Sequence, residues 1–589
     1  IWASDGASRT GGLDPNELRQ RAFVSLREVL GKLAAKRPLA LFVDDFHWGD
    51  VDSARLLTEL VRPPDPPALL LVIAFRDQVD EVEALRTLLT ADARSGRAIR
   101  EVTIGPLADA DALELALELL AAESKDKDPS ALAAKAEAYA RGAAGSPFFV
   151  GQLVRGQGSG DEAGGTSLAE LDKIVARRIL GLEPSQRDLL SVVAVAGGPL
   201  RRAVALEVCR DFDFDAALAP LLAGELLGTR GADEGTLDTV HDRIRQVTIG
   251  ELEADELVAV HRRLAEAFEL LGGDSESLAD HWERAGERVR AAHYAERAAY
   301  QASNSLAFER AVGLFRKTIA LFGAVETADP AELAELAERI NELELGLADQ
   351  LINVGRGREA AQLLLGLADR AGEPDLAREF RRRGADQLIK TGYVDEGLVE
   401  LDRLLQSVGL SLPKGQAGAL GALVWEQSRV MLRGRKFTQR AAKDIDPAVL
   451  DRIDTCFAVV NGLSTQEIVL SAIFHFRNLR YSLDAGEPHR VARALAYQCV
   501  VDVAGRKWDN VEDQLTCARS LAAQLGDAQL SGFIDLCEAS LHWFERRFTV
   551  SAQLHRKVID TLEGVAGANW QRRTAQDHHF WTQIGRAHV

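Results

Sequence analysis

An almost literal internal repeat constrains the fold of the second half of this chain. The pentapeptide Ala-Asp-Gln-Leu-Ile occupies residues 348–352 and recurs 37 residues later, at 385–389. Each copy is followed by a glycine, Gly355 or Gly392, and then by a second stretch with apolar residues at helical spacing. A period in the thirties is typical of stacked helical hairpins. We therefore expect a mainly α chain in which residues 251–583 form an α-solenoid of tetratricopeptide-like hairpins.

A different pattern governs the first hundred residues. A capped helix is expected from Pro15 to about residue 35, followed by the apolar run Leu39–Val43, which ends in the adjacent carboxylates Asp44 and Asp45. A short apolar run of this kind predicts a strand buried on both faces. In open α/β sheets the carboxyl ends of such strands face the ligand crevice. Carboxylates at that edge favour a bound cation, although they could instead cap the next helix, as Asp52 or Ser53 could.

The next segments continue this alternation. We expect a helix over 51–61, a strand from Leu69 to Phe75 that ends at Arg76, a helix over about 80–91 and a third strand over 99–104. Helices that alternate with strands predict a parallel sheet with crossover helices over residues 13–107. The Arg76 guanidinium could contact a phosphate, or it could pair with Asp77 or Glu81.

Residues 108–155 are expected to form a helical lid that ends in Gly-Ser-Pro-Phe-Phe-Val, where Pro147 is a first-turn proline. The composition of 156–167 is that of a flexible linker. Residues 168–250 combine short helices with a possible hairpin over 227–239, which suits a winged-helix-like domain. His241 then opens a charged helix, for which an ordinary helix start is the simpler alternative.

Taken together, these stretches resemble the STAND class of AAA-type signalling ATPases. Leu39–Ser53 is similar to their Walker B segment, and Leu69–Asp77 is similar to the strand that follows it. Gly145–Val150 looks like their Gly-x-Pro lid motif, and His241–Arg245 resembles the histidine-led helix of their winged-helix domain. The match spans roughly residues 13–565, and the four motifs occur in the family's order. The resemblance is strongest to the ATPase and tetratricopeptide region of large bacterial multidomain regulators.

This resemblance implies a role for each matching residue. Asp44 would hold Mg²⁺ through water, and Asp45 would help to position the attacking water. Arg76 would sense the γ-phosphate of ATP, Pro147 would pack near the adenine, and His241 would sense phosphate in the closed state. ATP and Mg²⁺ are thus the implied cofactors, and a nucleotide-dependent oligomer is a further implication.

One departure from the family pattern limits these expectations. No Gly-x-x-x-x-Gly-Lys-Ser/Thr sequence occurs in the 589 residues. We expect the phosphate-binding loop to precede residue 1, so that the chain is a fragment with a truncated ATPase core, a lead segment at 1–12 and a non-native tail at 584–589. The fragment itself should bind ATP weakly or not at all, because the loop's amides and lysine hold the triphosphate.

The net charge and the cysteine spacing limit the classes of partner that this chain is expected to bind. The formal net charge of −19 and a pI of about 5.2 argue against direct nucleic-acid or membrane binding by these residues. The cysteines at 209, 456, 499, 517 and 537 show no metal-ligand spacing, so free thiols in a reducing cytoplasm are expected. A protein partner or effector is expected on the helical-repeat surface.

Three functions follow from these observations. The first is an ATP-dependent signal-transduction regulator, namely the regulatory part of a bacterial serine/threonine protein kinase. The second is a LuxR-type transcriptional regulator whose DNA-binding domain lies outside the chain. The third is a non-enzymatic tetratricopeptide scaffold with a structural ATPase remnant.

Overall fold

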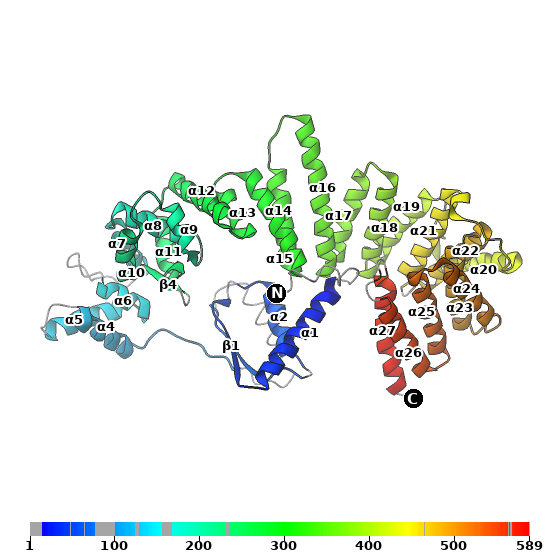
Figure 1. Cartoon of the computed structure of the whole chain (residues 1–589), viewed down its shortest axis with the longest axis horizontal. Helices are drawn as coiled ribbons and strands as arrows, with labels where there is room; N and C mark the ends of the chain where they lie inside the picture. Colours follow the sequence, from blue (N-terminus) through cyan, green and yellow to red (C-terminus); the bar gives the residue numbers. More distant parts are fainter. Residues whose placement is uncertain are drawn as a thin grey trace. The chain divides into compact units, whose positions relative to one another are not determined.

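The structure is a computed structural model that describes residues 15–46, 49–63, 65–76, 100–123, 129–155, 168–230, 235–464, 466–562, 565 and 568–587. Within these ranges the chain is mainly helical and contains two small sheets (Figure 1). Its contacts divide it into two compact units. The first contains residues 1–88, 303–312 and 341–589, and the second contains residues 89–302 and 313–340.

The core segment, which we define as residues 15–76, belongs to the first unit. Its elements are α1 (Pro15–Ala34), β1 (Leu39–Val43), α2 (Val51–Val61) and β2 (Leu69–Ile73). The two strands pair in parallel, with Leu39 opposite Leu69 and Val43 opposite Ile73. The elements expected for these residues are therefore present. Whether they belong to a P-loop-type sheet stays a prediction.

Two expectations for the parallel sheet predicted over residues 13–107 are wrong. Along each strand exposed residues alternate with half-buried ones, and Phe42 and Leu70 are 62% and 63% exposed. The strands are therefore not buried on both faces, because a two-stranded pair has one face that no described residue covers. Residues 100–104 form no strand, and Ile104 is 93% exposed. The helix expected over 80–91 lies outside the described residues.

The second unit begins with three helices in the expected lid. They are α4 (Asp109–Glu123), α5 (Pro129–Gly142) and α6 (Pro147–Arg155). Small and aliphatic residues such as Ala116, Leu120, Ala136 and Val150 form their common core. Gly145 lies before α6 with φ +77°, and a Cβ there would come within 2.7 Å of Pro106 Cβ. A side chain at this position is therefore excluded by both the backbone conformation and the close approach.

Residues 168–250 form a compact body of short helices and one small sheet. Its elements are α7 (Leu168–Leu180), α8 (Pro184–Val195), β3 (Leu200–Arg201), α9 (Arg202–Val208), α10 (Phe214–Ala223), β4 (Leu227–Arg230), β5 (Thr236–Thr239) and α11 (Asp242–Gly250). The sheet is antiparallel with the order β3-β5-β4, and β4 and β5 confirm the expected hairpin. The winged-helix assignment stays a prediction, and the expected linker at 156–167 lies outside the described residues.

The remainder of the described chain is an array of helices. They are α12 (Ala254–Leu271), α13 (Ser275–Arg284), α14 (Arg288–Asn304), α15 (Phe308–Gly323), α16 (Pro330–Asn353), α17 (Gly357–Arg370), α18 (Pro374–Lys390), α19 (Val394–Ser407), α20 (Gly415–Arg433), the 3₁₀ turn η2 (Ala442–Asp444), α21 (Pro447–Leu463), α22 (Ile468–Ala485), α23 (Pro488–Ala504), α24 (Val511–Leu525), α25 (Ala528–Phe544), α26 (Phe548–Thr561) and α27 (Asn569–Ala587). Consecutive helices such as α17, α18 and α19 pack on one another (Figure 1).

The sequence repeat corresponds to a structural repeat at two turns of this array. Gly355 and Gly392 have φ +86° and +90°, the left-handed conformation that glycine adopts without strain. After the first glycine, Arg356 N donates to Leu351 O at 2.8 Å. After the second, Tyr393 N donates to Leu388 O at 2.9 Å. The same hydrogen bond therefore closes both helices, which confirms a helical repeat at these positions.

The cysteine thiols are free, and all except the half-buried Cys517 are buried. Burial raises the pKa of Cys209, Cys456 and Cys499 to about 12, so these thiols stay protonated near neutral pH. Among the described helices, none combines the length and apolar character that crossing a bilayer requires.

Candidate nucleotide and coupling site

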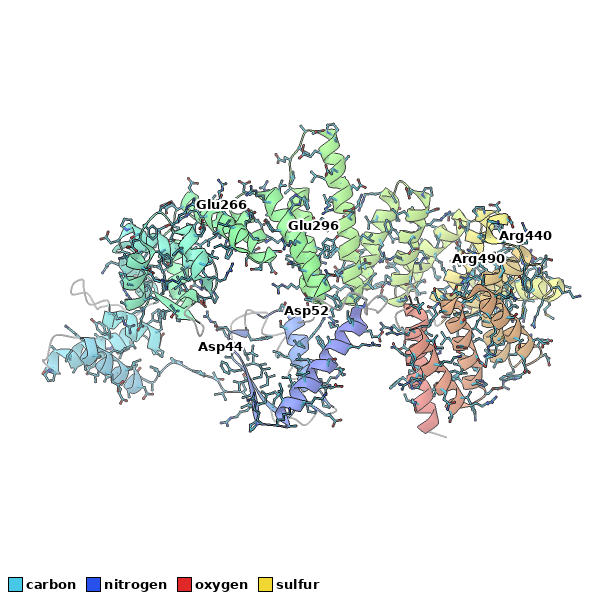
Figure 2. The ribbon with its side chains drawn as sticks, in the orientation of Figure 1. Asp44, Asp52, Glu266, Glu296, Arg440 and Arg490 are labelled. Carbon is cyan, nitrogen blue, oxygen red and sulfur yellow. The ribbon has the colours of Figure 1, made fainter. Side chains whose placement is uncertain are left out.

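The two adjacent carboxylates lie at the carboxyl end of β1, where the sequence places them. Asp44 and Asp45 are both exposed (Figure 2 labels Asp44). Asp44 Oδ1 accepts a hydrogen bond from Asp45 N at 3.0 Å. Asp45 has φ +51°, a left-handed conformation that aspartate tolerates better than most residues, and the chain turns here.

Arg76 follows the end of the neighbouring strand. The ladder between β1 and β2 continues past the strands, because Ala74 N donates to Val43 O and Phe46 N donates to Ala74 O, each at 2.9 Å. Arg76 is exposed and lies two residues beyond Ala74. The ends of β1 and β2 thus meet at one edge of the sheet, and this edge carries Asp44, Asp45 and Arg76.

This edge fits the metal side of a nucleotide site. Carboxylate oxygens are the ligands that Mg²⁺ prefers, and the Asp44–Asp45 amide contact occupies only one oxygen of Asp44. A guanidinium at the same edge suits phosphate. The fit is partial, because the residues that would cradle a triphosphate do not occur in this sequence.

Two further carboxylates with different contacts lie at the start of α2, namely Asp50 just before its first residue and Asp52 in its first turn. Asp50 caps α2, since its Oδ1 accepts from Ser53 N at 2.7 Å. The expectation that Asp52 or Ser53 caps this helix is therefore wrong. Asp52 Oδ2 instead accepts from Glu309 N at 3.0 Å and Arg310 N at 3.2 Å, in the first turn of α15. Asp52 thus caps a helix more than 250 residues away, which its sequence position does not suggest.

Asp52 is the centre of a half-buried polar cluster. Arg19 Nη1 lies 3.5 Å from Asp52 Oδ1, and the two side chains are only 14% and 11% exposed. The Arg19 guanidinium also lies over the Phe308 ring, 4.5 Å from its centroid. Burial raises the pKa of Asp52, while the amide hydrogen bond from Arg310 and the charge of Arg19 act in the opposite direction. Burying the charged Asp52 carboxylate therefore costs desolvation free energy, and its hydrogen bonds and the nearby Arg19 offset only part of that cost.

Glu309 extends this cluster into the helical array. Its Oε1 accepts from Arg55 Nη2 of α2 at 3.3 Å, and its Oε2 accepts from Arg356 Nη2 at 3.0 Å. A second polar contact joins α1 to α27, where Glu17 pairs with Arg572 and accepts from Gln576 Nε2 at 3.3 Å. Arg572 is only 2% exposed. The core segment therefore contacts two helices of the array that are far apart in sequence, α15 and α27.

Pro147 and His241 belong to the second unit, and Phe148 connects their elements. Pro147 is the exposed first residue of α6, and His241 is the N-cap of α11. His241 Nδ1 accepts from Arg243 N at 3.0 Å, and its ring stacks on Phe148 with a centroid distance of 4.1 Å and an interplanar angle of 13°. Phe148 packs against both the lid core and the core of residues 168–250. Phe148, the residue next to Pro147, therefore contacts His241.

Polar contacts reinforce this junction within the second unit. Arg178 of α7 hydrogen-bonds Gln152 of α6, and its Nη2 donates to Gly224 O at 2.8 Å. Arg155 of α6 pairs with Glu225. The lid and the 168–250 body are thus joined by a stacked ring pair and by two arginines.

Sequence reasoning located the strand-end residues and missed the two residues that connect modules. Asp52 looked like a local cap because it lies at the start of a helix. Phe148 carried no prediction of its own, and only its place beside Pro147 in the lid motif offered a signal.

Comparison with known proteins leaves the family open. No family model and no curated protein matches this sequence. A STAND protein with a tetratricopeptide repeat sensor from Pyrococcus horikoshii is similar at 13% identity and a TM-score of 0.39, over 95% of this chain and 73% of that one. A Naa15/Naa10 structure with HypK-THB is similar at 11% identity and a TM-score of 0.17, over 86% and 77% of the two chains. TM-scores below 0.5 do not establish a shared fold.

Proposed function

We propose that this chain is the regulatory part of an ATP-dependent signalling protein, in which a STAND-class ATPase module is coupled to a helical-repeat sensor. The observation that carries the proposal is that the β1–α2 connection links two acidic sites with different contacts. At its start are the candidate metal ligands Asp44 and Asp45, and just after it is Asp52, which caps α15 of the array. A change at the nucleotide edge would therefore reach the array within a few residues of chain.

The proposed roles at the nucleotide edge follow from side-chain chemistry. Asp44 would hold Mg²⁺ through water with the carboxylate oxygen that does not accept from Asp45 N. Asp45 would orient a water molecule, and Arg76 would contact phosphate oxygens through its planar fork. Bound Mg-ATP would supply the phosphoanhydride whose hydrolysis changes the charge at this edge. The proposal requires a phosphate-binding loop, which these 589 residues do not contain.

The lid supplies a second route for the same signal. Pro147 would pack near the adenine and His241 would respond to phosphate. Because Phe148 follows Pro147 directly and stacks on His241, a shift of α6 would displace His241 and the first turn of α11. This contact lies wholly within the second unit and supports a lid that moves together with the 168–250 body.

Hydrogen exchange at α15 tests the coupling. In a protein that carries this chain together with a phosphate-binding loop, we expect Mg-ATP to change exchange at the amides of Glu309 and Arg310. Asp44→Asn should abolish that change, whereas Asp65→Asn, which alters another exposed carboxylate of the core segment, should not. Nucleotide binding without any change at these amides would contradict the coupling. The 589 residues alone should bind ATP weakly, and micromolar affinity would contradict the assignment of the missing loop.

A non-enzymatic scaffold is the second candidate, and the repeated hairpin turns at Gly355 and Gly392 favour it. Helical arrays offer extended surfaces for protein partners without any chemistry. Signalling output in the complete protein separates the two: output that is unchanged by Asp44→Ala favours the scaffold. The same experiment requires an effector, for which we propose a serine/threonine kinase domain, with a LuxR-type DNA-binding domain as the alternative.

A further inference from the structure

A cavity of about 300 Å³ lies in the helical array of the first unit, and its lining shares no residue with the nucleotide edge. Its lining includes Arg435 and Phe437 from the segment after α20, together with Asn510, Asp513, Gln514 and Cys517 from the start of α24. This volume is at the lower end of small-molecule sites. The cavity therefore suits a compound of few heavy atoms.

The strongest indication of a ligand is an acceptor atom that has no partner. Gln514 is only 4% exposed, and its Oε1 has no hydrogen-bond partner among the described residues. A buried acceptor of this kind is costly to leave unpaired, so native structures usually satisfy it. Gln514 lines the cavity, and Oε1 itself is buried beneath its surface, so a ligand's donor would supply the missing hydrogen bond once this side chain turns slightly towards the cavity.

A chain of buried polar groups fixes the orientation of the Gln514 amide. Gln514 Nε2 donates to Asp502 Oδ2 at 3.2 Å, and Gln498 Nε2 donates to Asp502 Oδ1 at 2.7 Å. Gln498 Oε1 in turn lies 2.8 Å from Nε2 of the buried His475. Reversing the Gln514 amide would direct its oxygen at the Asp502 carboxylate, which is unfavourable. Oε1 is therefore the atom available for a ligand's donor.

The charges around the cavity favour a cation. Asp513 lines it and is exposed, and Asp502 lies directly behind Gln514. Among the described residues that line the cavity, Arg435 is the one cation, and its Nη2 lies 3.4 Å from Asp502 Oδ2, so it offsets only one of the two carboxylates. The Phe437 ring adds an aromatic wall, which attracts cations to its face.

We propose that this cavity binds a small compound through a primary ammonium group, with Asp513 and Gln514 Oε1 as its acceptors. Aliphatic diamines and free amino acids share this group. Within the proposed function the compound would be a signal for the sensor, and to that extent the inference rests on it. Binding itself requires no nucleotide, so its failure would be distinct from a failure of the ATPase proposal.

Calorimetric titration of the 589-residue chain with putrescine and with L-valine, at low ionic strength, tests this. We expect saturable binding of at least one of them, weakened about tenfold or more by Asp513→Asn, because hydrogen bonds to charged groups are strong. Glu512→Gln is the matched control, since it removes the neighbouring exposed charge, and it should change affinity less than about twofold. Gln514→Met should also weaken binding, with folding checked by circular dichroism.

Arg435→Gln separates the two sources of the ammonium group. It should strengthen putrescine binding, because a nearby cation is removed, and it should weaken L-valine binding if the guanidinium holds the carboxylate. If neither compound binds, or if Glu512→Gln weakens binding as much as Asp513→Asn, the proposal is wrong.

Discussion

Replacing Asp52 by alanine tests the contact that joins the core segment to the array. Asp52 Oδ2 accepts from the amides of Glu309 and Arg310 at 3.0 and 3.2 Å, so its removal takes the cap from the first turn of α15. Loss of such a cap costs about 0.5–2 kcal/mol. Arg19 would also lose a carboxylate 3.5 Å away, although the desolvation that raises the pKa of Asp52 offsets part of that loss.

We therefore expect Asp52→Ala to weaken α15's first turn by about 1–2 kcal/mol, a factor of roughly 5–30 in the local opening equilibrium. Hydrogen exchange measured by mass spectrometry should speed up by that factor at the amides of Glu309 and Arg310. Asp52→Asn keeps an acceptor oxygen and removes the buried charge, so it should change exchange less than about threefold.

Asp50→Ala is the matched control, because Asp50 caps α2, whereas the amides of Glu309 and Arg310 donate to Asp52. It should loosen the start of α2 and leave exchange at α15 unchanged. The reasoning fails if Asp52→Ala leaves Glu309 and Arg310 as protected as in the wild type. It also fails if Asp52→Asn speeds exchange as much as the alanine variant.

Three further changes have definite expected outcomes. Gly355→Ala should lower the free energy of unfolding of the array by about 1 kcal/mol in urea titrations, because φ is +86° there, whereas Gly366→Ala inside α17 should raise it by up to about 1 kcal/mol. Burial lowers the pKa of His475 from 6.5 to about 4, so stability should fall as the pH decreases from 6.5 towards 4, and His475→Asn should flatten that fall in denaturation midpoints. Phe148→Leu keeps apolar volume but removes the stacked ring, so exchange at the α11 amides next to His241 should increase about twofold to tenfold.

Each of these has a result that would contradict it. Equal destabilisation by both glycine substitutions would show that the left-handed turn is not the cause. A pH profile that is the same with and without His475 would assign the acid sensitivity to other buried histidines, such as His261, whose pKa burial lowers to about 4. Unchanged exchange in Phe148→Leu would show that the ring stack does not hold α11.

The sequence by itself determined the local elements of this protein. Apolar periodicity placed α1, α2 and β2 close to their observed bounds, because residues that bury one face of a helix or strand recur at its period. The repeated pentapeptide predicted two equivalent turns, and the left-handed glycines at 355 and 392 confirm them. The sequence also predicted that Asp44 and Asp45 lie at the end of β1, because they directly follow Val43, its last residue.

Only the tertiary structure decided which elements touch. Burial of β1 and β2 was mispredicted, because it depends on what covers the second face rather than on the strand itself. Asp52 contacts the amides of α15, and Phe148 contacts His241, through packing of segments far apart in the chain. Only the tertiary structure shows that Gln514 Nε2 donates to Asp502, which leaves Gln514 Oε1 as the acceptor for a bound compound. A carboxylate, ring or amide can serve many partners, and sequence spacing says nothing about which one the fold brings within hydrogen-bonding distance.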